Sequence, residues 1–403
     1  MALSNTKSKY LFIAVSFLLW FPHFIYVPIL SPYMETNGIS FSLIGIILGS
    51  YGLMQVLFRL PIGIGSDLVK QRKPFIILGM LASMLSCLIF IMTDSAGWIF
   101  VARSLAGIAA ASWVAFTVLY SSYFSDKEVH RAMGSISFII VLGQFLGMSF
   151  SGSIVEMWGW KAPFWIGVAA SAIGFILSFF IFEPKEKTIS NPMKLKDLTS
   201  VITQPSLLKI ALLSILAHSI IFSTMFGFTP TYALQIGFQP SELTFIVFAF
   251  MIPHAIATLF MGRVIVPLLG DWRSLKLAFL LTAVFIFILP LSEAKWGFYV
   301  IQGFSGFALG LIFPLLLGMS IESITPEKRA TAMGAYQAMY ALGIFAGPFF
   351  SGIINSWMGI EYGFYFTGCL GLTATLLIVS WKRNEVSIKF LGPRKWREKK
   401  ENG

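Results

Sequence analysis

Ionisable side chains inside long apolar stretches are the residues of this sequence that could do chemistry. Arg103 lies within the apolar run 97–122, and His23 and His218 lie in two other apolar runs. A charged arginine is costly in such surroundings and indicates a functional site, unless it extends to the membrane interface. Histidine titrates near neutral pH and could carry a proton, although a simple hydrogen bond within the helix is the alternative. These residues therefore suit charge recognition and proton transfer.

Motifs of the common enzyme classes do not occur in the sequence. It has no H-E-x-x-H, no G-x-S-x-G and no P-loop, so neither an enzyme nor an ATP-driven pump within this chain is indicated. Cys87 and Cys369 lie singly in apolar runs and lack the spacing of a metal site or a disulfide framework. We therefore predict a protein that is not an enzyme and that uses no metal or cofactor.

The composition indicates a helical membrane protein with many spans. Of the 403 residues, 57% are hydrophobic and only 12% are charged, and the mean hydropathy is +0.80. Soluble domains average about 25% charged residues, and apolar stretches of about 20 residues cross a bilayer. Twelve spans are predicted, at residues 10–30, 41–62, 74–93, 97–122, 132–155, 163–182, 208–230, 242–262, 275–292, 296–321, 330–355 and 361–381.

The positions of the basic residues predict that both termini are cytoplasmic. Of the 29 lysines and arginines, only Lys161 and Lys295 fall in outer loops, and Arg59 and Arg103 lie within spans. The others, including those at 70–73, lie on the side that the positive-inside rule assigns to the cytoplasm. The net charge of +11 therefore reflects membrane orientation. The basic residues are not interleaved with exposed aromatic residues on a soluble domain, so no nucleic-acid partner is expected.

The chain contains an internal repeat with an offset of 200 residues. The stretches GSISFIIVLGQFLGMSFSG (134–152) and GAYQAMYALGIFAGPFFSG (334–352) carry glycine at the same four positions. On a helix, small residues four apart form a stripe that lets backbones approach closely in a membrane. We expect these stripes to be helix-packing seams, which could also let one bundle move past the other. They comprise Gly143, Gly147 and Ser151, and Gly343, Gly347, Pro348 and Ser351.

The longest hydrophilic internal stretch separates the two copies of the repeat. We therefore predict an all-α membrane protein with twelve transmembrane helices in two pseudo-symmetric six-helix bundles. The N-terminal bundle covers residues 1–182, a cytoplasmic linker 183–207, the C-terminal bundle 208–382 and a basic cytoplasmic tail 383–403. Duplicated halves around a central site are an arrangement used for alternating access.

The loop between spans two and three carries a motif. It reads GIGSDLVKQRK (63–73) and is similar to the pattern G-x-x-x-D-R-x-x-G-R-[RK], from which Leu68 and Gln71 depart. On this motif the chain resembles the major facilitator superfamily, in particular its twelve-span drug/proton antiporters, over nearly its whole length. The resemblance implies the major facilitator fold and a conformational latch between the bundles. The latch residues are Gly63, Asp67, Arg72 and Lys73.

Two further motifs extend the resemblance. The run Arg103-Ser-Leu-Ala-Gly107 in span four is similar to the family's R-x-x-x-G motif, which implies a role for Arg103 in proton coupling. Span five is similar to the antiporter motif G-x8-G-x3-G-P-x2-G-G, with Met148 in place of proline and Ser151 in place of a glycine. Because of these departures, the span-five pattern fits a duplicated packing seam as well as it fits an antiporter.

By resemblance, spans one, four, seven and ten line a central cavity, to which spans five and eleven contribute. Ordinary helix packing accounts for many of their polar and aromatic residues.

No aspartate or glutamate lies near the middle of any span. This absence favours neutral, zwitterionic or anionic substrates, and Arg103 would suit an anion. The predicted cavity residues are Trp20, His23, Tyr26, Arg103, Trp113, Thr117, Gln144, His218, Thr224, Gln302, Tyr336, Gln337 and Tyr340.

The sequence thus predicts a monomeric secondary transporter of the cell membrane, with a small-molecule substrate and the lipid bilayer as its partners. The leading hypothesis is proton-coupled efflux of a small, amphiphilic or drug-like solute, with the proton gradient as energy source. Arg103, His23 and His218 would couple proton and solute. The alternative is a metabolite or organic-anion carrier of the same superfamily, working in uptake or exchange. A third hypothesis is a membrane receptor that transports nothing.

Overall fold

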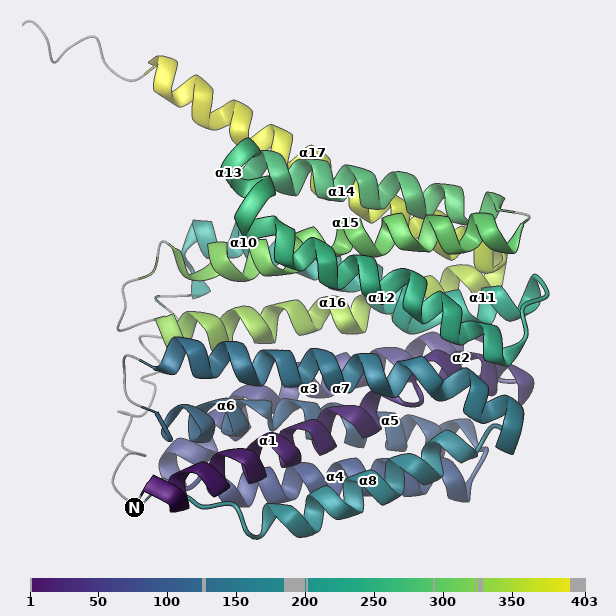
Figure 1. Cartoon of the computed structure of the whole chain (residues 1–403). Coiled ribbons are helices and arrows are strands. Elements are labelled where there is room, and N and C mark those ends of the chain that lie inside the picture. The colour runs from purple at the N-terminus through teal and green to yellow at the C-terminus, as the bar shows by residue number, and fades with distance from the viewer. Residues whose placement is uncertain are drawn as a thin grey trace, which may run out of the picture.

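The computed structural model describes residues 2–124, 128–184, 200, 202–292, 294–322, 324 and 329–391. In these ranges every regular element is a helix, and the helices run roughly along one axis (Figure 1). Eleven helical segments are long and apolar enough to cross a membrane, and the shorter helix α8 (Ala162–Ser178) takes the place of the sixth predicted span. The predicted all-helical architecture is confirmed.

The first half of the chain forms six of these segments. Span one consists of two helices because Pro22 cannot donate a backbone hydrogen bond inside α1 and Pro28 favours the start of α2. Span four is likewise divided, at Ser112. The helices are α1 (Ala2–Phe24), α2 (Val27–Thr36), α3 (Phe41–Val69), α4 (Lys73–Met92), α5 (Ala96–Ala111), α6 (Trp113–Ser121), α7 (Val129–Trp158) and α8.

The second half repeats this arrangement after the linker, most of which lies outside the described residues. Its last helix continues to Leu391, ten residues beyond the predicted end of span twelve at 381, into the predicted tail. The elements are α10 (Pro205–Ser223), η1 (Thr224–Phe228), α11 (Thr229–Gln235), η2 (Pro240–Glu242), α12 (Leu243–Phe260), η3 (Met261–Ile265), α13 (Val266–Leu269), α14 (Asp271–Ile288), η4 (Leu289–Leu291), α15 (Lys295–Glu322), α16 (Arg329–Met358) and α17 (Ile360–Leu391).

The backbone itself shows the duplication. Span one breaks between α1 and α2, and span seven departs from the α-helix at the equivalent place, in the π-helical turn η1. Gly159 and Gly359 both end a helix with positive φ, +85° and +109°, which suits glycine. Gly38 and Gly237 form a second such pair, at +75° and +96°. An offset of 200 residues for Gly159 and Gly359, and of 199 for Gly38 and Gly237, therefore relates the local backbone conformation of the two halves as well as their sequence.

The bundle has two ends, which we name by their residues. The turn face carries Gly38, Gly159, Gly237 and Gly359, and the basic face carries residues 70–73 and the end of span six at 183–184. In Figure 1 the basic face lies on the left and the turn face on the right. The predicted orientation makes the basic face cytoplasmic.

The two halves are joined at the turn face. The Thr231 hydroxyl donates to Ser31 Oγ at 2.7 Å, and the Ser241 backbone N–H donates to the Glu156 carboxylate at 2.9 Å. Helices α3 and α16 also approach closely there, because a Cβ on Gly45 would lie 2.4 Å from a backbone oxygen of α16. Small residues and cross-half hydrogen bonds therefore hold this end together.

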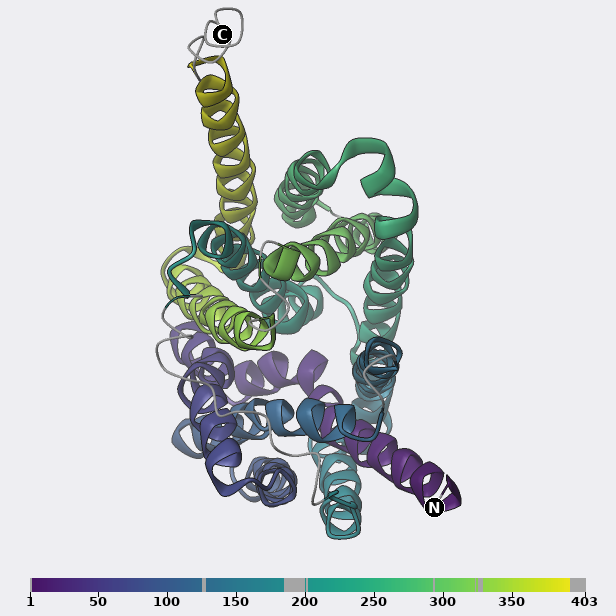
Figure 2. The same ribbon diagram turned by 90° about the vertical axis from the view of Figure 1, so that its left-hand side faces the viewer.

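Toward the basic face, glycines on three helices of the bundle meet no close neighbour. A Cβ built on Gly134, Gly318 or Gly334 has no atom within 4 Å outside its own surroundings in the helix. Figure 2 views this end, with the first half below and the second half above. Among the described residues, the hydrogen bonds that join the halves lie at the turn face, except those made by Arg59.

Candidate functional site

Arg103 is a buried charge held by aromatic side chains. It is only 2% exposed, and its guanidinium lies 4.2 Å from the centre of the Tyr51 ring. Its Nη1 donates to the Tyr26 hydroxyl at 3.4 Å, and its Nε has no hydrogen-bond partner in the described part of the chain. No carboxylate among the described residues lies within 4 Å of it. Cation–π contacts stabilise the guanidinium only partly.

The close packing of α5 on α3 explains this placement. Helix α5 is rich in alanine, and a Cβ on Gly107 would lie 2.5 Å from the Tyr51 backbone oxygen. Only glycine allows such an approach. Gly107 lies one turn after Arg103, so its contact with α3 brings the arginine over the Tyr51 ring. This gives the R-x-x-x-G spacing a physical reason.

His23 lies beside this arginine, at the break in span one. Its Nδ1 contacts the Leu19 carbonyl oxygen, and its Nε2 lies 3.1 Å from the Ala106 carbonyl oxygen of α5. Both oxygens can only accept, so a neutral imidazole satisfies one contact and a protonated imidazole satisfies both. The Tyr51 ring lies 6.3 Å away. The geometry therefore provides for a second proton on His23.

The other predicted cavity residues of the first half have more ordinary contacts. Trp20 packs edge-on against Trp113 at 5.3 Å, and its indole N–H has no partner among the described residues. The Thr117 hydroxyl donates to Val114 within its own helix at 3.0 Å. Gln144 is half-buried on α7. Of these residues in the described part of the chain, Trp20 is thus the one whose donor is fully buried without a partner.

In the second half, His218 is stacked against Tyr340. Their rings are 4.1 Å apart and parallel to within 2°, and His218 Nδ1 lies 2.8 Å from the Ser214 carbonyl oxygen. Tyr336 bonds the Ser214 hydroxyl at 2.8 Å. Thr224 donates within its own helix to Ile220 at 2.8 Å. Of the predicted residues of spans seven and eleven, His218, Tyr336 and Tyr340 therefore form one cluster with Ser214.

Gln302 occupies the place in the second half that Arg103 occupies in the first. It is buried on α15, and its amide nitrogen has no partner among the described residues. Gly306 follows one turn later and packs on α12, as Gly107 packs on α3. The repeat therefore places a neutral amide opposite a cation, and the two halves differ in charge at this depth.

Sequence reasoning missed Arg59 as a site residue. It lies on α3, is 3% exposed, and donates from Nη2 to Gln55 Oε1 at 2.7 Å. Its Nη1 donates across the interface to the Gln337 backbone oxygen at 3.2 Å and to the Tyr340 hydroxyl at 3.3 Å. The signal was present, since Arg59 is an arginine in an apolar span, but no recognised motif includes it.

Two aromatic residues that the sequence did not single out connect these clusters. Tyr51 stacks on Phe222 at 6.2 Å between ring centres, and Phe222 stacks on His218 at 6.5 Å. Rings therefore follow one another from Arg103, through the interface between the halves, to His218 and Tyr340 beside Arg59. The structure thus connects Arg103 of the first half with His218 and Tyr340 of the second half, whereas Thr117, Gln144, Thr224 and Gln302 have no contact with this chain of rings among the interactions described above.

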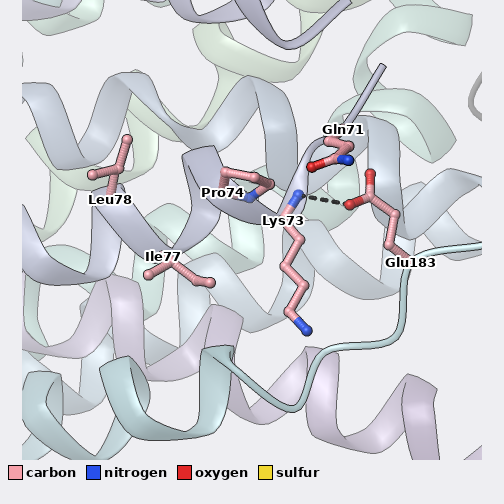
Figure 3. A pocket seen from close by; sticks show the side chains of 6 residues that line it. All are labelled: Gln71, Lys73, Pro74, Ile77, Leu78 and Glu183. Carbon is pink, nitrogen blue, oxygen red and sulfur yellow. Dashed lines mark hydrogen bonds between the residues drawn. The ribbon is translucent and has the colours of Figure 1, made fainter. Parts of the chain in front are cut away.

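A hollow lies beside the predicted latch, at the basic face. It is lined by Lys73, Glu183 and the start of α4, and the Lys73 ammonium points away from Glu183 (Figure 3). The Glu183 carboxylate instead accepts the backbone N–H groups of Arg72 and Lys73, at 2.5 and 3.1 Å. A carboxylate at a helix N-terminus is stabilised by the helix dipole. Glu183 therefore ties the end of span six to α4.

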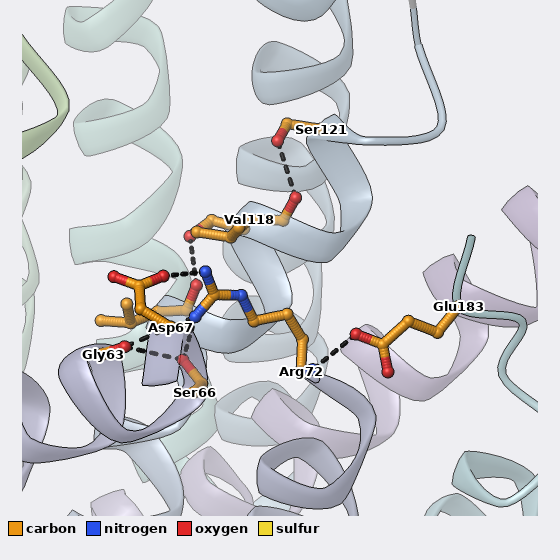
Figure 4. A network of polar contacts seen from close by, with 9 residues as sticks. Gly63, Ser66, Asp67, Arg72, Val118, Ser121 and Glu183 are labelled. Atoms are coloured by element: carbon orange, nitrogen blue, oxygen red, sulfur yellow. Dashed lines mark hydrogen bonds and ion pairs between the residues drawn. The ribbon is translucent and has the colours of Figure 1, made fainter. Parts of the chain in front are cut away.

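The remaining latch residues contact one another within the first half. Arg72 forms an ion pair with Asp67 and a hydrogen bond to Ser66, and its backbone is held by Glu183 (Figure 4). Gly63 Cβ would meet only Val114, also of the first half. Within the described ranges, the bonds of Arg72 reach Gly63, Ser66, Asp67 and Glu183 and no residue of the second half. A latch between the halves remains a prediction for another state.

The two predicted packing seams lie inside the halves. A Cβ on Gly143 or Gly147 would meet α1 and the residue after it, at 3.2 and 2.9 Å. Those on Gly343 and Gly347 would meet backbone oxygens of α10 at 2.1 and 2.4 Å. The hydroxyl of Ser151 bonds within its own helix, and Ser351 and Pro348 lie along the same helix as the second stripe. The contact between the halves uses glycines of α3, such as Gly45 and Gly52, together with the last glycine of each copy of the repeat, Gly152 and Gly352.

Comparison with known proteins identifies the family. The model of the Major Facilitator Superfamily matches residues 12–245 and 233–400. Multidrug resistance protein 2 of Bacillus subtilis is 24% identical over 89% of this chain and 91% of its own length. The inner membrane transport protein YajR of Escherichia coli is 26% identical over 89% and 79%, and the quinolone resistance protein NorA of Staphylococcus aureus 21% identical over 93% and 96%.

Solved structures agree in fold. A single-residue mutant of the nucleoside transporter NupG superposes with a TM-score of 0.77 at 14% identity, covering 93% of this chain and 99% of that one. The human organic anion transporter MFSD10 gives 0.67 at 18% identity, with coverage of 93% and 99%. With the twelve-segment duplicated architecture and the loop motif at Gly63, these matches place the protein: the chain is a multi-pass membrane transporter, not an enzyme, and belongs to the Major Facilitator Superfamily.

Proposed function

We propose that the protein carries a small organic anion with an apolar body across the cell membrane, as a monomer with both termini in the cytoplasm. The observation that supports this most is the buried Arg103, which has ring faces and one hydroxyl as neighbours and no carboxylate within 4 Å among the described residues. A charge removed from water is costly unless it is paired. A bound anion would supply the missing partner.

The surroundings of Arg103 suit the remainder of such a substrate. Its Nε–H has no partner within the described ranges, so a donor is available for an anionic oxygen. Tyr26 and Tyr51 add apolar ring surface with polar hydroxyls. Binding sites for small molecules are commonly apolar, with a few placed polar groups. The site therefore favours an amphiphilic anion over a fully hydrophilic one.

The geometry also supports movement of a proton together with the anion. His23 has two carbonyl acceptors for a protonated ring, and it shares the Tyr51 ring as a neighbour with the buried cation Arg103 of α5. Two tyrosines lie beside this pair: the Tyr26 hydroxyl accepts a hydrogen bond from Arg103, and the Tyr51 ring adjoins both Arg103 and His23. An anion bound at Arg103 would neutralise the cation and favour protonation of His23. Because linkage is reciprocal, the proton would in turn favour the anion.

Alternating access would move this site from one side of the membrane to the other. In the structure the halves are joined at the turn face, which is the outer face in the predicted orientation. Release of these contacts, with formation of the latch between the halves at Asp67 and Arg72, would give the opposite state. The direction of net flux would follow the gradients of anion and proton.

Proton-coupled efflux of a drug-like solute is the second candidate. The names of several relatives support it, since they include multidrug resistance, quinolone resistance and sugar efflux proteins. Exchange requires that solute and proton exclude each other in the site. The contacts of Arg103 and His23 favour joint binding instead, so the two candidates predict opposite signs of proton movement.

A charge series on one carbon skeleton tests the proposal. Decanoate, decanamide and decylammonium would be titrated against the full-length protein in detergent, with thermal unfolding as the readout. We expect decanoate to stabilise the protein most strongly and Arg103→Gln to remove that preference. Equal stabilisation by all three, or a preference for decylammonium, would contradict an anion site and favour the drug-efflux candidate.

A further inference from the structure

Arg59 presents the same problem as Arg103, at a different depth of the bundle. It is nearly fully buried, its partners are a side-chain amide, a backbone carbonyl and a hydroxyl, and its Nε has no partner among the described residues. No carboxylate of the described chain lies within 4 Å of it. Neutral oxygens satisfy its hydrogen bonds but leave its charge without a counter-charge.

We propose that Arg59 binds a second anionic group, so that the transported substrate is a dianion whose two charged groups are separated by an apolar segment. This rests on the proposed function, because it adds a second charge contact to the anion site at Arg103. Arg59 would then determine specificity between organic anions with one charge and those with two.

The spacing along α3 sets the length of such a substrate. Tyr51, whose ring contacts Arg103, precedes Arg59 by eight residues, which is about 12 Å along a helix axis. The Arg103 guanidinium lies 4.2 Å from the Tyr51 ring centre, and the Arg59 guanidinium lies 5.7 Å from the Tyr340 ring centre across the interface. Two anionic groups about 8–12 Å apart would therefore reach one arginine each.

The surface between the two arginines is apolar and aromatic. Tyr51, Phe222 and His218 follow one another with nearly parallel rings, and His218 is stacked on Tyr340, above which Arg59 lies at 5.7 Å. A hydrocarbon or aromatic segment would pack on these rings, while its ends meet the two cations. A short polar dianion would leave this surface uncovered.

Arg59 also differs from Arg103 in that it contacts both halves. It belongs to α3, but two of its hydrogen bonds go to Gln337 and Tyr340 of α16. A second anionic group at this point would compete for the same donors, and so it would bind where the two halves meet. Occupancy at Arg59 would therefore depend on the relative position of the halves, as a transport site requires.

A pair of ligands with the same number of carbons tests this proposal. Sebacate carries two carboxylates and decanoate one, and the affinity of each is measured by thermal-shift titration of the full-length protein. A second carboxylate is costly to desolvate, so sebacate gains affinity only if a second cation receives it. We expect sebacate to bind at least about tenfold more tightly than decanoate, the factor of one charge-assisted hydrogen bond.

The variants Arg59→Gln and Arg59→Lys test whether Arg59 causes the preference for sebacate over decanoate. Arg59→Gln should lower sebacate affinity at least about tenfold more than it lowers decanoate affinity, whereas Arg59→Lys should keep part of the preference because it keeps the charge. If Arg59→Gln does not fold, the wild-type series suberate, sebacate and dodecanedioate decides, since a fixed spacing predicts an optimum of length.

The outcomes separate this proposal from the proposed function. Equal or weaker binding of sebacate than of decanoate, a sebacate preference that survives Arg59→Gln, or affinity that is indifferent to chain length would overturn the dianion while leaving the anion site at Arg103 in place. If decanoate also fails to bind in preference to decanamide, the proposed function fails, and the dianion with it.

Discussion

Replacement of Arg103 by methionine should weaken anion binding without lowering the stability of the ligand-free protein. Placing an arginine at the centre of a span costs about 2.5–3.5 kcal/mol on insertion scales, which is an upper limit for Arg103 because it lies nearer the turn-face end of the segment Ala96–Ser121. Against this, the structure offers a cation–π contact, worth about 2 kcal/mol when desolvated, and one hydrogen bond of 3.4 Å, near the limit for such a bond. We therefore expect Arg103→Met to leave the ligand-free protein as stable as the wild type, or about 1 kcal/mol more stable.

The same substitution should greatly weaken anion binding. Hydrogen bonds to charged groups contribute about 1.5–3 kcal/mol each, which corresponds to a loss of about 10- to 100-fold in decanoate affinity. The assay is thermal unfolding of the purified protein with and without decanoate. Arg103→Lys is the matched control, since it keeps the charge and should retain part of the binding.

Two results would refute this reasoning. If Arg103→Met unfolds several kcal/mol more easily without ligand, the arginine stabilises the fold and its charge has partners in the empty protein. If the variant is stable and still binds decanoate like the wild type, the anion does not contact Arg103. Either result would require a different site.

Three further predictions concern packing, pH and orientation. Gly343→Ala should lower thermal stability by about 1–3 kcal/mol, because its Cβ would lie 2.1 Å from a backbone oxygen of α10; Gly134→Ala, with no atom within 4 Å, should be neutral or stabilising. A tyrosine hydroxyl and a lysine hold the pKa of Asp94 below its usual range. The stability that its ionised form contributes should thus be present above the ordinary pKa of aspartate and be lost as the pH falls through the lowered value. The stability difference between wild type and Asp94→Asn should then vanish in acid, and a difference that grows on acidification would contradict this sign. In a cysteine-free background, an impermeant maleimide added to intact cells should label Ser95→Cys on the turn face and spare Gln71→Cys on the basic face; the reverse pattern would invert the predicted orientation.

The duplicated fold could be predicted from the sequence because it rests on local signals. Apolar lengths gave the spans, and the matching glycines around Gly143 and Gly343 gave the offset that the backbone repeats at Gly159 and Gly359. The partners of the glycine stripes could not be predicted, since small-residue spacing marks a close contact without naming the neighbouring helix. The structure places these contacts within the halves.

The candidate site was only partly predictable. Arg103 was found because a charge in an apolar span is unusual and a motif includes it. Arg59 is also a charge in an apolar span, but it lies outside the motifs. The sequence therefore indicated its place within a span without marking it as a site residue. Tyr51 and Phe222 are aromatic residues in apolar helices, of which the chain has many. Only their positions beside Arg103 and His218 give them a role.

A reversible cross-link between the halves tests the account most directly. Ser31 and Thr231 are related by the 200-residue offset, and their hydroxyl oxygens lie 2.7 Å apart across the turn face. Both would be replaced by cysteine in a background without Cys87 and Cys369, and the protein reconstituted in liposomes. The solute is radiolabelled decanesulfonate, which stays ionised and does not cross the bilayer unaided. We predict that oxidation to the disulfide stops decanesulfonate flux and that reduction restores it, whereas undiminished flux through the cross-linked protein would contradict alternating access around this site.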